Sequence, residues 1–166
     1  MKAGSNSALY RDFWAELKGQ LELPSSPLPG APMKVENSTK TVCYFQWIDD
    51  VKLEGWLNIT SNATRVQIAL FGTGAARRFD RLHAQKRTIE RDLGERLVWR
   101  DPRHDPEKLR ATNATYFIQT RDQPCQPSDR GTWPLIQAWL ATRLRAFHAV
   151  FSVPGRLDEL RRDEPK

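Results

Sequence analysis

Three consecutive strand-like segments between residues 41 and 71 constrain the fold most strongly. Residues 41–47, 52–60 and 65–71 are rich in aromatic and β-branched side chains and partly alternate apolar with polar residues. This pattern is typical of strands that bury one face. Turns of two or three polar residues separate them, and connections this short join only antiparallel neighbours. We therefore predict an antiparallel three-stranded meander.

Helical patterns lie on both sides of the meander. Residues 7–21, 75–93 and 132–151 carry apolar side chains at helical spacing. Two further short strands are predicted at 96–100 and 115–119. The order is αβββαββα, and because strands and helices are partly segregated we predict the α+β class with a mainly antiparallel sheet packed against helices. The clearest helix is 75–93, whose apolar stripe is formed by Ala75, Phe79, Leu82, Ile89 and Leu93.

A length of 166 residues fits one domain with one core. We assign residues 1–155 to a single domain, and the proline-rich stretch 23–32 to an extended linker inside it. Residues 156–166 are highly charged, so we expect them to form a frayed tail.

The composition indicates a soluble protein with acidic partners. The net charge is +6 with a pI near 9.6, and arginine favours bidentate contacts to phosphate or carboxylate. No apolar run approaches the length of a membrane span, and residues 1–7 lack the core of a signal peptide. Cys43 and Cys125 form no recognisable disulfide or zinc framework. We therefore expect a cytoplasmic protein without membrane contact.

Familiar catalytic motifs do not occur in the sequence. The Walker A, GxGxxG, HExxH and GxSxG patterns are missing, as is any cysteine–histidine cluster. We therefore predict no catalytic residue, no metal site and no cofactor. The Gly72-Thr-Gly74 segment before the 75–93 helix has two interpretations, a phosphate-binding loop or a purely structural turn.

Arginines gather on the polar side of the 75–93 helix. Such a row can follow a phosphate backbone, because affinity there depends on basic side chains rather than on base sequence. The alternative is a solvated helix face with local ion pairs. The predicted nucleic-acid-binding residues are Arg77, Arg81, Arg87 and Arg91, with Arg78 at the margin.

Four other residues are candidates for a cleft. Lys86 falls near the middle of the apolar stripe, where an ammonium group needs a partner such as Glu54, a path to solvent, or a ligand. Trp56 and Trp99 are the tryptophans best placed for an aromatic cleft, although strand tryptophans also belong to cores.

The chain resembles a bacterial domain family of unknown function. Members of that family are often fused to NucS-like or other restriction-type nuclease domains and also stand alone, so the resemblance implies a setting in DNA processing or defence rather than an activity. The residues that carry the resemblance are 10–14 (Tyr-Arg-Asp-Phe-Trp), 67–71, 79–82, Lys86, Ile89, Glu90, Gly94, 97–99 and a tryptophan-rich closing helix.

The order αβββαβ also resembles the core of PD-(D/E)XK nucleases. That core needs an acidic residue on one strand and a D/E-x-K pair on the next, whereas the corresponding strand here reads Gln67-Ile-Ala69. The resemblance therefore implies a degenerate site, unless Glu54 and Lys86 replace the missing groups. A likeness to the type III secretion chaperone fold would instead imply a protein-binding module.

These observations favour a non-catalytic domain that binds nucleic acid or a partner protein through the arginine face. Two alternatives stay open. One is a metal-dependent nuclease with a migrated site, and the other is an oligomeric protein-interaction module. The sequence does not fix the oligomeric state.

Overall fold

The computed structural model describes residues 3–21, 40–105, 107 and 115–161. Within them lies a six-stranded antiparallel sheet with the order β1-β2-β3-β5-β4, and β6 also pairs with β3. The predicted meander is confirmed, because the first three strands pair as sequential neighbours. The strands are β1 (Thr41–Ile48), β2 (Val51–Asn58), β3 (Ala63–Leu70), β4 (Val98–Arg100), β5 (Tyr116–Gln119) and β6 (Gln123–Pro124).

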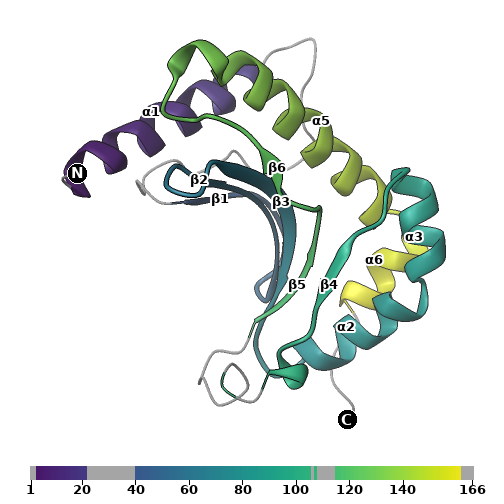
Figure 1. The fold of residues 1–166 in the computed structure, drawn as a ribbon. Helices are drawn as coiled ribbons and strands as arrows, with labels where there is room; N and C mark the ends of the chain where they lie inside the picture. Colours follow the sequence, from purple (N-terminus) through teal and green to yellow (C-terminus); the bar gives the residue numbers. More distant parts are fainter. Residues whose placement is uncertain (1–2, 22–39, 106, 108–114, 162–166) are drawn as a thin grey trace.

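The described helices pack on one side of the sheet (Figure 1). The sheet is strongly curved, and the helices lie along its convex side, so the fold is α+β as predicted. Among the described elements, no helix covers the concave side. The helices are α1 (Ala3–Leu21), α2 (Ala75–Ala84), α3 (Lys86–Leu93), α5 (Trp133–Phe151) and α6 (Pro154–Arg161), with 3-10 turns η1 (Pro102–His104) and η2 (Arg130–Thr132). No described helix is long and apolar enough to cross a membrane.

Strand β2 shows how the core forms. Val51, Leu53 and Leu57 are fully buried, and the residues between them point to the opposite side of the sheet. Gly55 allows α1 to approach this strand closely, since a Cβ there would lie only 3.4 Å from the Trp14 ring. The indole and benzyl rings of α1 and α5 then fill the convex side.

The predicted 75–93 helix is divided into α2 and α3 at Gln85, where the backbone adopts φ −100° and ψ 13°. All five residues of the predicted apolar stripe are buried. The prediction of one continuous helix is wrong because the two halves follow different neighbours. Helix α2 packs against β3, β5 and α6, whereas α3 packs against α5.

The charged C-terminal segment is ordered as α6 through residue 161. Arg156 is only 5% exposed, and its guanidinium donates to the Val150 carbonyl at 2.9 Å and to Asp92 at 2.7 Å. Leu160 is fully buried. The expectation of a frayed tail is therefore wrong for 156–161, because Arg156 and Glu159 have partners and Leu160 is buried. Residues 162–166 and the predicted linker 23–32 lie outside the described residues.

Gly72 shapes the turn between β3 and α2. Its φ is +80°, and a Cβ there would lie 2.7 Å from a carboxylate oxygen of Asp50. An acidic side chain of the chain itself therefore occupies this turn and would repel a phosphate. The structural interpretation of the Gly72-Thr-Gly74 segment fits these contacts, whereas the phosphate-binding one does not.

We predict that Gly72→Ala lowers the free energy of unfolding by about 2 kcal/mol or more, because the methyl group adds a clash with Asp50 to the left-handed strain. Gly94→Ala is the matched control, since Gly94 has φ +77° with no atom within 4 Å, and it should cost about 1 kcal/mol. Urea denaturation of both variants measures the difference. Equal losses would show that the Asp50 contact is irrelevant to stability.

Candidate functional site

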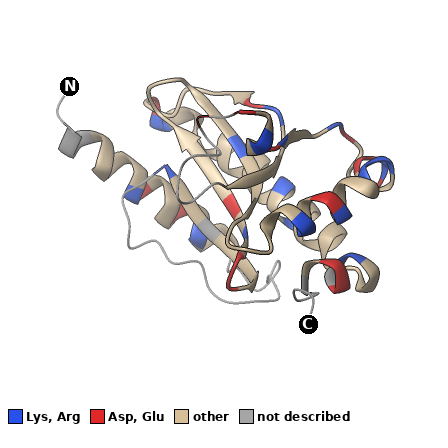
Figure 2. Cartoon of the chain, turned by 90° about the horizontal axis from the view of Figure 1, so that it is seen from below, with Lys and Arg blue, Asp and Glu red and all other residues tan. Residues whose placement is uncertain are grey.

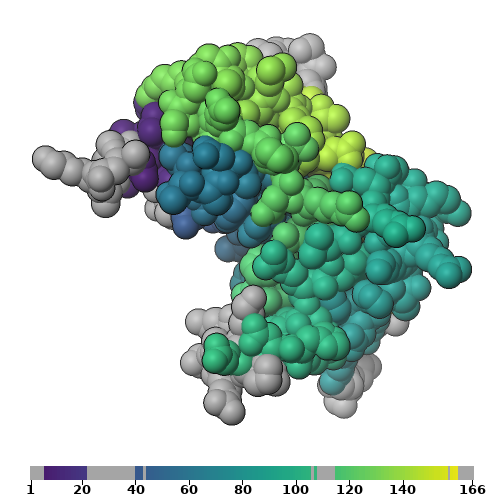
Figure 3. Space-filling view, in the orientation of Figure 1, coloured from purple at the N-terminus to yellow at the C-terminus, as the bar shows by residue number. Residues whose placement is uncertain are grey.

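The concave side of the sheet carries most of the polar strand residues. Cross-strand pairing arranges these residues in rows that run from β2 across β3 towards β5 and β4. Figure 3 shows the molecule hollowed on this side. We call this surface the concave face and define it by Lys52, Glu54, Trp56, Arg65, Gln67, Ala69, Arg100, Phe117 and Gln119.

A stacked cation and indole form the first row. The Arg65 guanidinium carbon lies 3.8 Å from the centre of the Trp56 ring. Arg65 Nε donates to Gln67 Oε1 at 3.0 Å, and its NH1 donates to Asp122 Oδ1 at 3.1 Å. Burial lowers the pKa of Arg65, Asp122 raises it, and the nearby Arg100 lowers it further. An arginine pKa still lies far above neutral pH, so Arg65 is a fixed and well-oriented positive charge.

The second row consists of Glu54, Gln67 and Gln119, which lie directly opposite one another on β2, β3 and β5. Gln67 Nε2 donates to Glu54 Oε1 at 2.9 Å. Burial raises the pKa of Glu54, an effect that the hydrogen bond from Gln67 and the charge of Lys52 oppose. Gln119 is 1% exposed, and among the described residues its Oε1 has no hydrogen-bond donor. The row therefore combines a partly desolvated carboxylate with an unsatisfied buried acceptor.

The third row consists of Lys52, Ala69, Phe117 and Arg100, which lie opposite one another on β2, β3, β5 and β4. Lys86 is on α3 on the helix-covered side of the sheet, so the suggestion that it complements Glu54 is wrong. No cluster of three or more His, Cys, Asp or Glu side chains suited to a metal occurs among the described residues.

The five arginines predicted to bind nucleic acid do not form one surface. Arg78 is 5% exposed, and its Nε and NH1 have no hydrogen-bond partner in the part of the chain that the structure describes. Arg81 lies 3.6 Å from Glu159 of α6, and Arg91 lies 3.4 Å from its neighbour Asp92. Arg77 and Arg87 are exposed. The docking of α6 onto α2 removes part of the predicted ridge, and Figure 2 shows acidic and basic residues interspersed on the helices.

Trp56 and Trp99 do not share a cleft, because the sheet lies between their side chains. Trp99 pairs with the core residue Ile118, whereas Trp56 pairs with Arg65 on the concave face. The Trp99 indole donates to Glu90 Oε1 at 3.0 Å and packs edge-on against Phe79. Trp99 thus stabilises the contact of β4 with α2 and α3. The prediction that these residues share a cleft is wrong for Trp99 and Lys86, which lie on the helix-covered side of the sheet. Glu54 and Trp56 both lie on the concave face.

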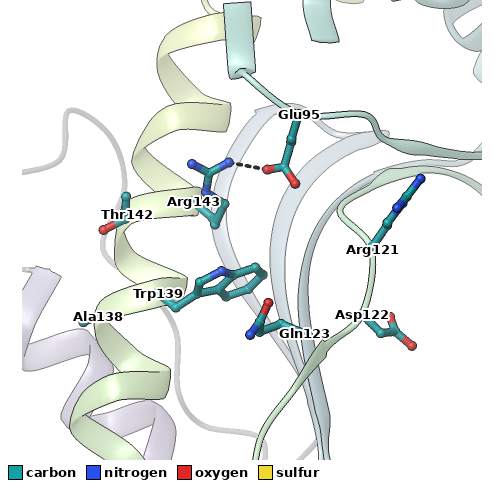
Figure 4. Close-up of a pocket in the computed structure, with 8 residues that line it drawn as sticks. All are labelled: Glu95, Arg121, Asp122, Gln123, Ala138, Trp139, Thr142 and Arg143. Atoms are coloured by element: carbon teal, nitrogen blue, oxygen red, sulfur yellow. Dashed lines mark hydrogen bonds and ion pairs between the residues drawn. The ribbon is translucent and has the colours of Figure 1, made fainter.

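A cavity of about 530 Å³ lies beside α5 (Figure 4). The Trp139 ring reaches into it beside the Gln123 amide, and Arg143 forms an ion pair with Glu95 at its rim. Asp122 also lines this cavity while it binds Arg65. One ion pair therefore connects the cavity with the concave face.

An adjoining cavity of about 380 Å³ is more apolar. It shares Gln123 and Trp139 with the first cavity and includes Leu135, which is 79% exposed. Cys125 also lines this cavity, and burial raises the pKa of its thiol to about 11. This thiol stays protonated at neutral pH, and a protonated thiol is a poor nucleophile.

Sequence reasoning missed several residues of these sites, among them Lys52, Arg65, Arg100, Gln119 and Trp139. The predicted strands contain Lys52, Arg65, Arg100 and Gln119 without an assigned role, and the predicted 132–151 helix contains Trp139 without one. The alternation of polar residues in 65–69 is the signal that could have identified Arg65, because alternate strand residues share one face. Trp139 has no such signal, since its helical spacing fits both a core and a cavity wall.

Comparison with known proteins gives one family. No curated protein and no solved structure matches the chain significantly. A family model described as Domain of unknown function (DUF4268) matches residues 9–154, which run from within α1 to the first residue of α6. Because the match covers most of the sequence, the chain belongs to this family of domains of unknown function.

Proposed function

We propose that the chain is a non-catalytic nucleic-acid-binding domain and that the concave face is its binding surface. The observation that carries this proposal is the stacking of Arg65 on Trp56 at 3.8 Å on a side of the sheet that no described helix covers. Aromatic rings and arginines side by side are the usual elements of surfaces that hold bases and phosphates.

The charges of the concave face support this choice. Lys52, Arg65 and Arg100 outnumber Glu54, the carboxylate within the same rows. Neighbouring strands lie about 4.8 Å apart, so the charges on β2, β3 and β4 are spread over roughly 15 Å, with the uncharged β5 between β3 and β4. A phosphate backbone crossing the strands would meet several cations along this path. The exposed Arg77 and Arg87 on the helix side add only to the long-range positive potential.

The first test compares two pairs of charges. We predict that Lys52→Gln combined with Arg100→Gln weakens binding of a single-stranded oligonucleotide by about tenfold at 50 mM salt. The slope of log affinity against log salt should fall by about 1.5, since two phosphate contacts are lost. Fluorescence anisotropy across a salt series measures both quantities.

The matched control is Arg87→Gln combined with Arg91→Gln, which removes the same charge from exposed positions on α3. It should change affinity less than about threefold. A larger loss in this control than in the Lys52 and Arg100 pair would assign binding to the helix side. Absence of any binding at low salt would refute the proposed function.

The second test uses the raised pKa of Glu54. Because the ionised carboxylate repels phosphate, affinity of the wild-type chain should increase as pH falls through that pKa. We predict that Glu54→Gln binds about threefold more tightly at neutral pH and loses this pH dependence. Anisotropy titrations between pH 4.5 and 8 measure the effect.

The same shift predicts a stability change of defined sign. A carboxyl group with a raised pKa in the folded chain favours folding in its protonated form, so the free energy of unfolding decreases as pH rises through the pKa. Glu54→Gln should therefore be more stable than the wild type at pH 7 and should still accept the hydrogen bond from Gln67. Lower stability of Glu54→Gln at pH 7 would contradict this account.

A second candidate function is the metal-dependent nuclease with a migrated site. The position of Lys52 favours it. Lys52 lies opposite Ala69 of β3 and two residues before Glu54 on β2, so both side chains are on the concave face. Magnesium or manganese would then support cleavage of DNA or RNA, and Glu54→Gln would abolish it. In a non-catalytic domain, the same substitution would instead tighten binding, and the wild type would not cleave. Glu54→Gln therefore distinguishes the two functions.

A further inference from the structure

The cavity beside α5 is open to solvent and has the size of a small-molecule site. Its volume is about 530 Å³, and ligand sites of proteins usually measure about 300 to 1,000 Å³. Most of its lining residues, among them Arg121, Gln123 and Thr142, are exposed at the surface. A molecule can therefore enter this cavity from the solvent.

The two carboxylates in the wall of this cavity are already engaged. Glu95 forms an ion pair with Arg143, and Asp122 forms one with Arg65 of the concave face. Arg121 is exposed, and no carboxylate among the described residues forms an ion pair with it. The charge that the wall leaves uncompensated is therefore positive.

The free polar groups of the wall are mainly hydrogen-bond donors. A guanidinium and an indole N–H only donate, whereas the Gln123 amide can both donate and accept. The side chains of Arg121, Gln123 and Trp139 have no hydrogen-bond partner in the described part of the chain. Trp139 is half-buried, and its indole N–H is still open to solvent. A ligand that fits this cavity therefore supplies acceptors, as a carboxylate does.

An apolar compartment continues this cavity along α5. The adjoining cavity of about 380 Å³ shares Gln123 and Trp139 with it. Its wall includes Leu135, which is 79% exposed, and the protonated Cys125 thiol, which behaves as a small apolar group. The Trp139 ring therefore lies where a polar and an apolar compartment meet (Figure 4).

The aromatic wall indicates the shape of the apolar part of the ligand. Aromatic rings gain energy from offset or edge-on contacts with one another beyond the burial of their area. A flat ring beside Trp139 would also cover part of the exposed Leu135 side chain, and the removal of apolar surface from water is favourable.

We propose that the two cavities form one site for a small aromatic carboxylate, whose ring packs against Trp139 and whose carboxylate binds Arg121. The site uses none of the residues that define the concave face. The inference therefore goes beyond the proposed function and does not depend on it.

The experiment titrates the isotopically labelled chain with 2-naphthoate and with its uncharged counterpart 2-naphthamide. Tryptophan indole N–H signals in NMR spectra report binding, and Trp139→Phe identifies the Trp139 signal. 2-Naphthoate should shift this signal with a Kd below about 1 mM. It should bind about fivefold more tightly than 2-naphthamide, because only the carboxylate forms a charge-assisted hydrogen bond with Arg121.

Arg121→Gln tests the charged end of the site. It should weaken binding of 2-naphthoate about fivefold and leave the affinity for 2-naphthamide within about twofold of the wild type. The matched control is Arg87→Gln, which removes the same charge from an exposed position on α3. It should leave the affinity for both compounds within about twofold.

Trp139→Leu tests the aromatic wall and should weaken binding of both compounds about tenfold. Circular dichroism and thermal unfolding establish that this variant is folded. If it is not, Arg121→Gln decides alone, because Arg121 is exposed and its substitution leaves the core intact.

Four results would overturn the site. One is equal affinity of the wild type for the acid and the amide, and another is a folded Arg121→Gln that binds 2-naphthoate as the wild type does. The third is a shift of other tryptophan signals while that of Trp139 does not move. The fourth is the absence of any shift at about 5 mM 2-naphthoate. None of these results bears on oligonucleotide binding, so the proposed function stands or fails separately.

Discussion

The antiparallel register between β2 and β3 determines both sides of this molecule. It pairs Leu53 with Ile68 on the convex side and Glu54 with Gln67 on the concave side. Because side chains alternate along a strand, a slip of one residue would exchange the apolar and polar sets. The helices would then face polar side chains and could not bury their apolar residues against the sheet. The burial that stabilises the fold therefore also fixes the polar rows of the concave face.

Arg65 connects the polar and aromatic side chains of that face. It stacks on Trp56, donates to Gln67 and pairs with Asp122 at the edge of the cavity beside α5. A guanidinium held by three partners loses little further side-chain entropy when a ligand binds. Substitution of Arg65 would also release Gln67 and Asp122, so the charges of Lys52 and Arg100 are better reporters of binding.

The sequence was sufficient for the strand meander and the class of fold. The short turns allowed only antiparallel pairing, and the partial alternation of apolar and polar residues indicated strands that bury one face. The apolar stripe of 75–93 correctly identified five buried residues, but it contained no sign of the break at Gln85. That break depends on α3 packing against α5 and α2 packing against α6, contacts between segments far apart in the chain. The charged C-terminal segment was misjudged for the same reason, since the partners of Arg156 lie on α3 and α5.

The candidate site was predictable only in part. Glu54 and Trp56 were selected from the sequence, and they do share the concave face. Trp99 and Lys86 were selected with them, although the sheet separates both from Glu54. A helical wheel placed Arg78 at the edge of a solvent-exposed row, but it could not show that α6 docks on α2 beside that row. The acids Asp80 and Asp92 bind Arg103 and Arg156, two arginines outside the helical segment that carries the predicted row.

The proposed function requires that a nucleic acid binds on the concave side of the sheet. Titration of the isotopically labelled chain with a short single-stranded oligonucleotide, followed by backbone amide NMR, tests this claim most directly. We predict that the amides with the largest shifts belong to residues 52–56 of β2, 65–69 of β3 and 117–119 of β5. Shifts confined to α2 and α3, or to the cavity wall of α5, would contradict the account.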